Sequence, residues 1–365
     1  MADEQPGENR AHPNPLTPIE YADAVVAPGS SEHQRVLAAL GRHGFGQQWT
    51  FRRPARRHSS VVLAASNARS ICIKFYDHSP SASWKCSSER LLAHVKALSA
   101  LRGRVPVPHT LVAAMEPDDF GLPTLVTTAV AETPVKDAIA AAAGPARKEL
   151  ATSIAAALAA LTEVTPTDVA MPDCSIDEIE RQFGAMLQEE IQWYDDWLGA
   201  KGKRRGLGCH DLVRRGQQVF ANGAPPLQKP CLVHSDLGVN NITSSATQPV
   251  AIIDWDLARI GSPADDLGKF LARSLIDVPI PREQRLDLVR FFIGSYCSQR
   301  EGAGPEVLPG ALILALSEAL YKMAVREQDE AVWVAEMMLK ELDDNGSVLR
   351  SGRQGASTDA DRPGC

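Results

Sequence analysis

The chain has 365 residues, of which 44% are hydrophobic and 23% charged, and its formal net charge is −7 at pH 7. This length and balance predict a globular protein with one bilobal unit or two domains, and they exclude collagen-like, coiled-coil and mostly disordered chains. Because the net charge is negative, we expect no nucleic-acid partner. Seven cysteines without a CxxC pair argue against a disulfide framework and against a zinc site.

Both ends of the chain are polar, and we expect residues 1–16 and 344–365 to be disordered tails. The first fifteen residues lack the basic start and the apolar stretch of a signal peptide. No later window is expected to be long and apolar enough to span a bilayer. We therefore expect a cytoplasmic protein without a membrane partner.

From residue 17 to residue 130 the pattern favours a small lobe of strands with one long helix. Short apolar runs bounded by turn residues are typical of strands. Between them, Leu91, Leu98 and Leu101 recur at helical spacing behind two serines that can cap a helix. The expected elements are a short helix at 30–46, strands at 59–65 and 70–76, a helix at 87–101, and strands within 105–116 and 122–130.

From residue 131 to residue 343 the pattern is mostly helical, and the only strand signals bracket a Gly- and Asn-rich turn. A sheet-rich half followed by a helical half indicates the α+β class. The expected helices lie near 135–144, 146–162, 176–199, 281–300 and 308–342, and the expected strands at 231–234, 241–243 and 250–255.

The turn between these strands carries His234, Asp236 and Asn241, and the following strand ends on Asp254. Carboxylates and amides beside apolar strands cost free energy unless they bind a partner, so the cluster indicates a site. For any one of these residues the alternative is a polar turn stabilised by local backbone bonds. Four such positions at fixed spacing rarely coincide by chance, which favours the site.

Residues 234–241, HSDLGVNN, match the catalytic loop H-x-D-x-x-x-x-N of kinases, and Asp254 follows Asn241 by thirteen residues. The segment IIDWDLARIGSPADDLG resembles the aminoglycoside phosphotransferase and choline kinase family, whose pattern is D-W-[DE]…G-x-P…D. This resemblance implies a bilobal, protein-kinase-like α+β fold. Residues 17–130 would form the nucleotide-binding lobe, and residues 131–343 the helical lobe for catalysis and acceptor binding.

The resemblance also implies an enzyme that uses ATP or GTP and Mg²⁺ to phosphorylate a hydroxyl of a small molecule. Asp236 would orient that hydroxyl and accept its proton. Asn241 and Asp254 would hold the metal through oxygen atoms. His234 and Asp266 would support the loop, whereas the neighbouring Asp265 is expected to be solvated.

In the first lobe the resemblance requires a strand lysine and a helix carboxylate near the phosphates. Lys74 is the only lysine in the first 84 residues, and Glu89 is the only acid in the following helix. Relatives place this glutamate four or five residues nearer to residue 105, and a Gly-rich loop is missing here. The alternatives are a solvent-facing lysine and a glutamate that only interacts with the helix dipole. The remaining candidates are backbone groups, those of Ser59 and Ser60 for the phosphates and those of Thr127 and Ala129 for the adenine edge.

In the second half of the segment 176–199, four acids are interleaved with aromatic residues, as in a wall for an amino sugar or another cationic, hydroxyl-rich acceptor. The alternative is a solvated helix face, and the basic run at 201–205 favours an anionic or polar acceptor instead. An antibiotic-inactivating kinase is the leading prediction. A housekeeping kinase for choline, homoserine or a sugar, and a nucleotide-binding pseudokinase, remain open. The four acids are Glu189, Glu190, Asp195 and Asp196.

Overall fold

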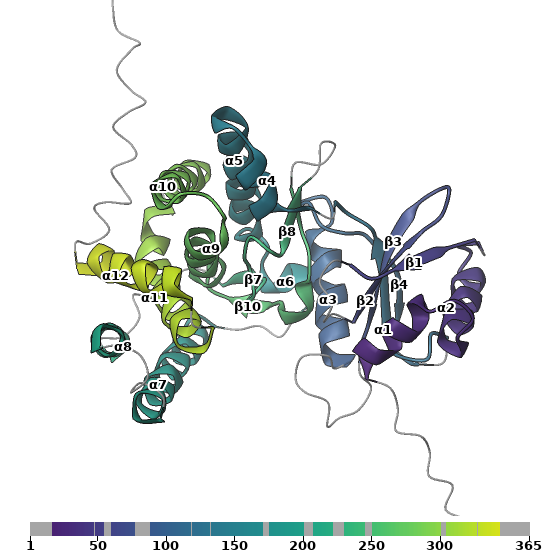
Figure 1. Ribbon diagram of the computed structural model, residues 1–365, viewed down its shortest axis with the longest axis horizontal. Helices are drawn as coiled ribbons and strands as arrows, with labels where there is room; N and C mark the ends of the chain where they lie inside the picture. Colours follow the sequence, from purple (N-terminus) through teal and green to yellow (C-terminus); the bar gives the residue numbers. More distant parts are fainter. Residues whose placement is uncertain are drawn as a thin grey trace, which may run out of the picture. The chain divides into compact units, whose positions relative to one another are not determined.

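The computed structural model divides the chain into two compact units, each described here by itself (Figure 1). Unit 1 consists of Met1–Val95 and Thr110–Ala129, and unit 2 of Lys96–His109 and Val130–Cys365. The two predicted tails lie outside the described residues. The structure describes residues 17–46, 48–54, 60–76, 88–117, 119–131, 133–170, 175–200, 207–221, 230–244, 250–300, 304–326 and 328–343.

Unit 1 is built on an antiparallel sheet with the strand order β1-β2-β3-β5-β4. In β3 every second side chain faces the core, and Ile71, Ile73 and Phe75 are fully buried. This period of two is what positions Lys74 on the opposite face of the strand. The strands are β1 Thr50–Arg52, β2 Val61–Ala65, β3 Ser70–Phe75, β4 Thr110–Ala114 and β5 Thr124–Thr128, and the helix α3 is Ser88–Leu101.

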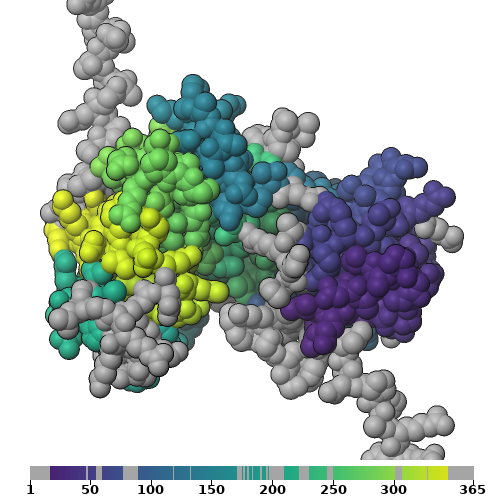
Figure 2. Space-filling model, in the orientation of Figure 1, coloured from purple at the N-terminus to yellow at the C-terminus, as the bar shows by residue number. Residues whose placement is uncertain are grey.

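Two N-terminal helices, α1 (Pro18–Val26) and α2 (Ser31–Arg42), complete unit 1. They form one continuous surface on its visible face (Figure 2). Thr17 and Glu20 form a capping box that starts α1, and the Ser30 hydroxyl accepts a bond from the N–H of His33 at the start of α2. The apolar sides of both helices join the core of the sheet through side chains such as Tyr21, Val25, Val36 and Leu40.

Unit 2 consists of helices packed around two small sheets, with orders β6-β8-β9 and β10-β7. The helices are α4 Val135–Ala141, α5 Gly144–Leu161, α6 Pro166–Val169, α7 Ile176–Ala200, α8 Leu207–Ala221, α9 Pro263–Asp277, α10 Arg282–Gln299, α11 Gly304–Val325 and α12 Asp329–Asp343. The strands are β6 Thr133–Pro134, β7 Cys231–Val233, β8 Ile242–Ser244, β9 Ala251–Ile252 and β10 Arg259–Gly261.

The helix α9 is almost entirely buried at the centre of unit 2, where α11 packs closely against it. The contact is close because residue 268 is glycine: a Cβ at this position would lie 2.5 Å from the carbonyl oxygen of Ala311 and 2.7 Å from the Cβ of Leu314. Every residue of the first turn of α9 from Pro263 to Asp266 is also buried. The start of this helix is therefore held firmly next to the strands β7 and β10.

The helix α11 corrects one expectation from the sequence. Among the helices in the described ranges, its segment Glu306–Val325 is long and apolar enough to cross a membrane. However, 78% of its most apolar stretch is buried inside the protein. Its apolar residues are explained by packing against α9 and α12 on different sides, so no hydrophobic periodicity is required of it.

Residues 96–109 belong to unit 2, whereas the sequence placed them in the first lobe. Two interactions account for this difference. The N–H of Ile252 donates to the carbonyl of Pro106 at 2.9 Å, and Arg104 forms an ion pair with Asp168 at 2.9 Å. The second half of α3 and the loop after it are thus bonded to strands and helices of unit 2.

Candidate active site

The loop His234–Asn241 connects β7 to β8 in unit 2. All three residues of β7 and all three of β8 are buried, so both ends of the loop are anchored in the core. β7 pairs with β10, and β8 pairs with β9, in antiparallel register. The loop residues therefore come close to the chain segment that follows β9.

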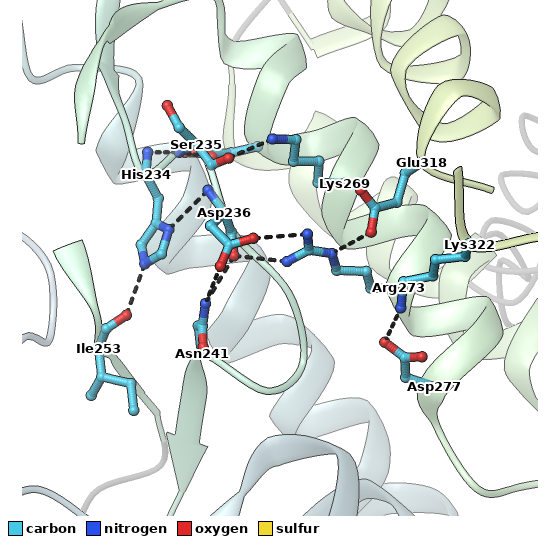
Figure 3. Close-up of polar contacts among 11 residues, drawn as sticks. His234, Ser235, Asp236, Asn241, Ile253, Lys269, Arg273, Asp277, Glu318 and Lys322 are labelled. Carbon is cyan, nitrogen blue, oxygen red and sulfur yellow. Dashed lines mark hydrogen bonds and ion pairs between the residues drawn. The ribbon is translucent and has the colours of Figure 1, made fainter. Parts of the chain in front are cut away.

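His234 uses both ring nitrogens to hold the backbone of the site (Figure 3). Its Nε2 lies 2.8 Å from the carbonyl oxygen of Ile253, and its Nδ1 lies 3.2 Å from the backbone nitrogen of Asp236. These partners assign the proton to Nε2, leaving Nδ1 as an acceptor. The ring also lies 4.7 Å from that of Trp255, which is fully buried. His234 is therefore a structural support with no ring nitrogen left for proton transfer.

Asp266 binds the same loop from the first turn of α9. Its carboxylate accepts bonds from the backbone N–H groups of His234 at 2.7 Å and Ser235 at 2.9 Å. Ser235 also has a left-handed backbone, with φ of 65°. One turn along α9, the ammonium of Lys269 donates to the carbonyl of Ser235 at 2.5 Å. The loop backbone is thus bonded to α9 through both its donors and its acceptors.

Asp236 is fixed by Asn241, five residues later in the loop (Figure 3). The amide nitrogen Nδ2 of Asn241 donates to the carbonyl oxygen of Asp236 at 2.9 Å and to its carboxylate Oδ2 at 3.2 Å. Asn241 is buried, but 39% of the Asp236 side chain is exposed. The carboxylate therefore has a fixed orientation and remains accessible to a molecule from solvent.

Asp254 lies two residues after β9, the strand that pairs with β8. The N–H of Ile253 donates to the carbonyl of Asn241 at 2.9 Å, which extends the β8–β9 ladder to the residue directly before Asp254. Asp254 has a left-handed backbone, with φ of 70° and ψ of 54°, and it is exposed. Asp is among the few residues that tolerate this conformation. The sharp turn is anchored by Trp255, whose indole N–H donates to Ile252.

The donor chemistry of Asn241 and Asp254 fits Mg²⁺. Because the Asn241 nitrogen is bonded to Asp236, its amide oxygen is turned away from that residue and is available to a cation. Asp254 adds a carboxylate, and Mg²⁺ typically completes its ligand set with water and phosphate oxygens. No group of three His, Cys, Asp or Glu residues suited to a metal occurs in the described ranges, so an all-protein metal cage is not what these residues form.

Lys74 lies on β3 in unit 1, half-buried, with its ammonium 5.5 Å from the ring centroid of Tyr76. The hydroxyl of Tyr76 is bonded to Nδ1 of the buried His94 on α3, at 2.8 Å. His94 stands five residues after Glu89, where relatives are expected to carry their glutamate. Glu89 itself lies in the first turn of α3 with an exposed side chain. Sequence reasoning missed the Tyr76–His94 link between strand and helix.

The other nucleotide candidates are backbone groups of unit 1. Ser60 is buried at the start of β2, and its carbonyl accepts a bond from Phe75. Thr127 lies in β5 between β3 and β4, and the N–H of Ala129 donates to Ser70 at 3.1 Å. This bond occupies the N–H of Ala129, one of the backbone groups expected at the adenine edge, and leaves its carbonyl for that role. Ser59 lies outside the described residues.

The acidic helix α7 is only partly described. Glu189 and Asp196 are exposed, and Asp196 accepts a bond from Gln192 at 3.2 Å. Within the described residues, neither carboxylate is bonded to the catalytic loop. The side chains of Glu190 and Asp195 lie outside the description. The aromatic residues behave differently, since Tyr194 is buried and donates to Ser317 of α11, whereas Trp193 is 40% exposed.

Asp265 corrects a second expectation, because it is buried and not solvated. Its carboxylate forms an ion pair with Arg259 at 2.5 Å. Burial raises the pKa of Asp265, and the charge of Arg259 opposes that shift. Asp265 also lies 2.8 Å from where a Cβ of residue 261 would be, which explains the glycine there. Its role is to join β10 to the start of α9.

The sequence analysis also missed Arg273 and Glu318. Arg273 lies on α9 and forms ion pairs with Asp236 and with Glu318 of α11, both at 2.8 Å (Figure 3). The only sequence signal for the contact between Arg273 and the loop is the spacing of Asp266, Lys269 and Arg273 along one face of the helix.

Comparison with known proteins identifies the family. The model of the phosphotransferase enzyme family matches residues 50–302, which is more than half of the chain. A comparison with curated proteins gives no match. Similar solved structures include the GDP complex of an aminoglycoside 2'-phosphotransferase, with 15% identity, a TM-score of 0.58, and coverage of 87% of this chain and 99% of that one.

Two macrolide 2'-phosphotransferases are also similar in structure. One, of type I, has 18% identity and a TM-score of 0.52, and the match covers 86% of this chain and 98% of that one. The other, from Brachybacterium faecium, has 14% identity and a TM-score of 0.50, and the match covers 83% and 97%. These likenesses confirm the protein-kinase-like, bilobal α+β fold expected from the sequence. With the family match and the loop geometry together, the chain belongs to the phosphotransferase enzyme family.

Proposed function

We propose that the protein transfers the terminal phosphoryl group of ATP or GTP to a hydroxyl of a small molecule, and that this acceptor is an antibiotic. One observation carries the proposal: in a chain of the phosphotransferase family, the Asp236 carboxylate is held by Asn241 and is partly exposed. A fixed carboxylate that solvent molecules can reach is suited to accept a proton from an alcohol.

In this proposal Asp236 orients the acceptor hydroxyl and accepts its proton. The enzyme has little covalent work to do in phosphoryl transfer, because positioning and charge neutralisation supply most of the catalysis. The bond from the Asn241 amide to Oδ2 orients the Asp236 carboxylate, and the bonds to Asn241 and to the His234 ring hold the Asp236 backbone. The hydroxyl is thereby directed along one line of approach.

Asn241 and Asp254 would bind Mg²⁺ through one amide oxygen and one carboxylate. When bound, the ion neutralises charge on the phosphate oxygens. Asp254 reaches this position because its left-handed backbone turns the chain directly after β9. Lys74 would add a positive charge from unit 1, with Glu89, Ser59, Ser60, Thr127 and Ala129 as the further nucleotide-side candidates.

The choice of nucleotide and of acceptor draws on the similar structures. These structures include complexes with GDP, with ADP, and with ATP together with streptomycin. Another holds GDP and kanamycin. These complexes support a purine nucleotide and a hydroxylated antibiotic. A kinase of this kind uses the nucleotide pool of the cytoplasm. We therefore propose the cytoplasm as the location of this protein.

An acceptor panel tests this function. The full-length protein is incubated with Mg²⁺ and either ATP or GTP, and ADP or GDP release is measured with kanamycin, streptomycin, a macrolide, choline, homoserine and a hexose. We expect turnover with an antibiotic and mass-spectrometric detection of its phosphorylated form. Turnover only with choline, homoserine or the sugar would show that the acceptor is a metabolite and not an antibiotic. Nucleotide binding without turnover on any acceptor would indicate a pseudokinase.

A further inference from the structure

Arg273 contacts the catalytic aspartate at two separate atoms. Its Nη2 lies 2.8 Å from the carboxylate Oδ1 of Asp236, and its Nη1 donates to the carbonyl oxygen of the same residue at 2.9 Å. Asn241 bonds the other carboxylate oxygen, Oδ2. Asp236 therefore has one donor on each carboxylate oxygen, and two donors on its carbonyl (Figure 3).

Glu318 holds the guanidinium from the other side. Its Oε1 accepts the bond from Nε of Arg273 at 2.8 Å, so Arg273 lies between two carboxylates from different parts of the chain. The Arg273 and Glu318 side chains are only 17% and 10% exposed. Ion pairs at such low exposure are screened less than surface pairs and have better defined geometry. The planar fork of arginine suits this arrangement better than an ammonium would.

Charge balance keeps Arg273 protonated in this position. Burial alone disfavours its positive charge, but Glu318 and Asp236 outweigh that effect and raise the pKa of Arg273 above its ordinary value. The helix α11 lies beyond residue 302, where the match to the family model ends. Glu318 is therefore a feature of this chain outside the matched region.

We infer that Arg273 and Glu318 are positioning residues for Asp236. Arg273 fixes the carboxylate and the loop backbone at once, and Glu318 fixes Arg273. This inference rests on the proposed function of Asp236 as the residue that orients the acceptor. The exposed part of the Asp236 carboxylate then faces the acceptor in one orientation. This matters for the rate of transfer, because a misplacement of about 1 Å can lower a rate by roughly 10²-fold.

The test compares Arg273→Met, Arg273→Lys and Glu318→Gln with the wild type in the full-length protein. The rates are phosphoryl transfer to the best acceptor of the panel and nucleotide hydrolysis with water as acceptor, and nucleotide Kd is measured separately. We expect Arg273→Met to lower kcat by on the order of 10²-fold, with a nucleotide Kd within about twofold of the wild type. Arg273→Lys should recover part of that loss.

A double variant separates the two residues. If Glu318 acts only through Arg273, Glu318→Gln lowers kcat by itself but adds no further loss to Arg273→Met. Lys322→Met is the matched control. Lys322 forms an ion pair with Asp277 at 2.5 Å in the same α9–α11 interface, with similar exposure of 13% and 12%, and it does not contact the loop (Figure 3). We expect it to lower Tm as Arg273→Met does, while kcat stays within about twofold.

The outcomes distinguish this inference from the proposed function. An active wild type whose kcat is unchanged by Arg273→Met overturns the positioning role alone. So does a control Lys322→Met that lowers kcat as strongly, or an additive loss in the double variant. A wild type that transfers phosphoryl to no acceptor and not to water overturns the proposed function, and the positioning role with it.

Discussion

At the scale of single residues, the surroundings of Asp236 explain why residue 238 is glycine. Gly238 lies two residues after Asp236, where the side chain of Arg273 passes over the loop. A Cβ at residue 238 would overlap Cδ of Arg273 and lie 3.1 Å from its Nη1. The backbone of Gly238 is not in the left-handed region, so close approach and not backbone freedom requires the glycine.

Gly238→Ala is therefore expected to displace Arg273 and lower kcat by about tenfold or more. The control is Gly294→Ala on α10, where nothing lies within 4 Å of a built Cβ. That change should stabilise the protein by roughly 0.4–1 kcal/mol and leave kcat unchanged. Steady-state rates and thermal unfolding of both variants provide the measurement. A Gly238→Ala enzyme with the wild-type kcat would contradict the steric account.

Asp254 allows a second test at the residue scale. Asp254→Asn keeps a side chain that tolerates the left-handed backbone but removes the charge. We expect nucleotide affinity in the presence of Mg²⁺ to fall by at least about tenfold, or roughly 1.4 kcal/mol. Affinity in the presence of EDTA should not change. Titration calorimetry under both conditions measures this, and equal Mg²⁺ dependence in both proteins would remove Asp254 from the metal site.

At the scale of elements, the packing of α9 against α11 holds the site in place. Arg273 pairs with Glu318, and one turn further along both helices Asp277 pairs with Lys322, so the helices run in the same direction. The two pairs have opposite polarity. A slip of one turn in either direction would oppose Arg273 to Lys322 or Asp277 to Glu318, which are like charges. This pattern favours one register of the two helices.

Gly268→Ala tests the closeness of this packing. The added methyl group would meet backbone atoms of α11, which cannot move aside as a flexible side chain can. We expect a loss of about 1–3 kcal/mol in the free energy of unfolding, although alanine favours helices more than glycine does. Denaturant unfolding gives the value. A stabilised Gly268→Ala protein would show that the helices separate more easily than their contact suggests.

Most long helices could be predicted from the sequence, whereas several of the shortest strands could not. The helices α2, α3, α5, α7 and α10 were expected within a few residues of their observed bounds. The three-residue strands β1 and β10 and the two-residue β6 lack enough residues to show a period of two. The helix α1 was missed although Thr17 and Glu20 form a capping box, because the helix has only nine residues. The helix α8 was missed as well.

The candidate site divides in the same way. The placement of His234, Asp236 and Asn241 in one loop, with Asp254 after the next strand, could be predicted because these residues lie in one local motif with fixed spacing. Arg273 and Glu318 could not, because their contact joins residues 45 positions apart on two helices. Asp265 was expected to be solvated because an Asp-Asp pair at a helix start is usually exposed, whereas Arg259 allows it to be buried here.

At the scale of the whole molecule, the family match spans residues 50–302 and thus includes parts of both units. The residues proposed for the metal and the acceptor lie in unit 2, and Lys74 lies in unit 1. We therefore expect nucleotide affinity to depend mainly on Lys74 and the metal residues, and little on the carboxylate of Asp236. Loss of Asp236 is expected to stop turnover without releasing the nucleotide, which separates chemistry from binding in one protein.

The most direct measurement is the comparison of Asp236→Ala with the wild type for both turnover and nucleotide affinity. We expect kcat to fall by about 10²–10⁴-fold, the range typical of a lost general base, while nucleotide Kd stays within about twofold. An Asp236→Ala protein that still phosphorylates the acceptor at the wild-type rate would contradict the role assigned to this carboxylate.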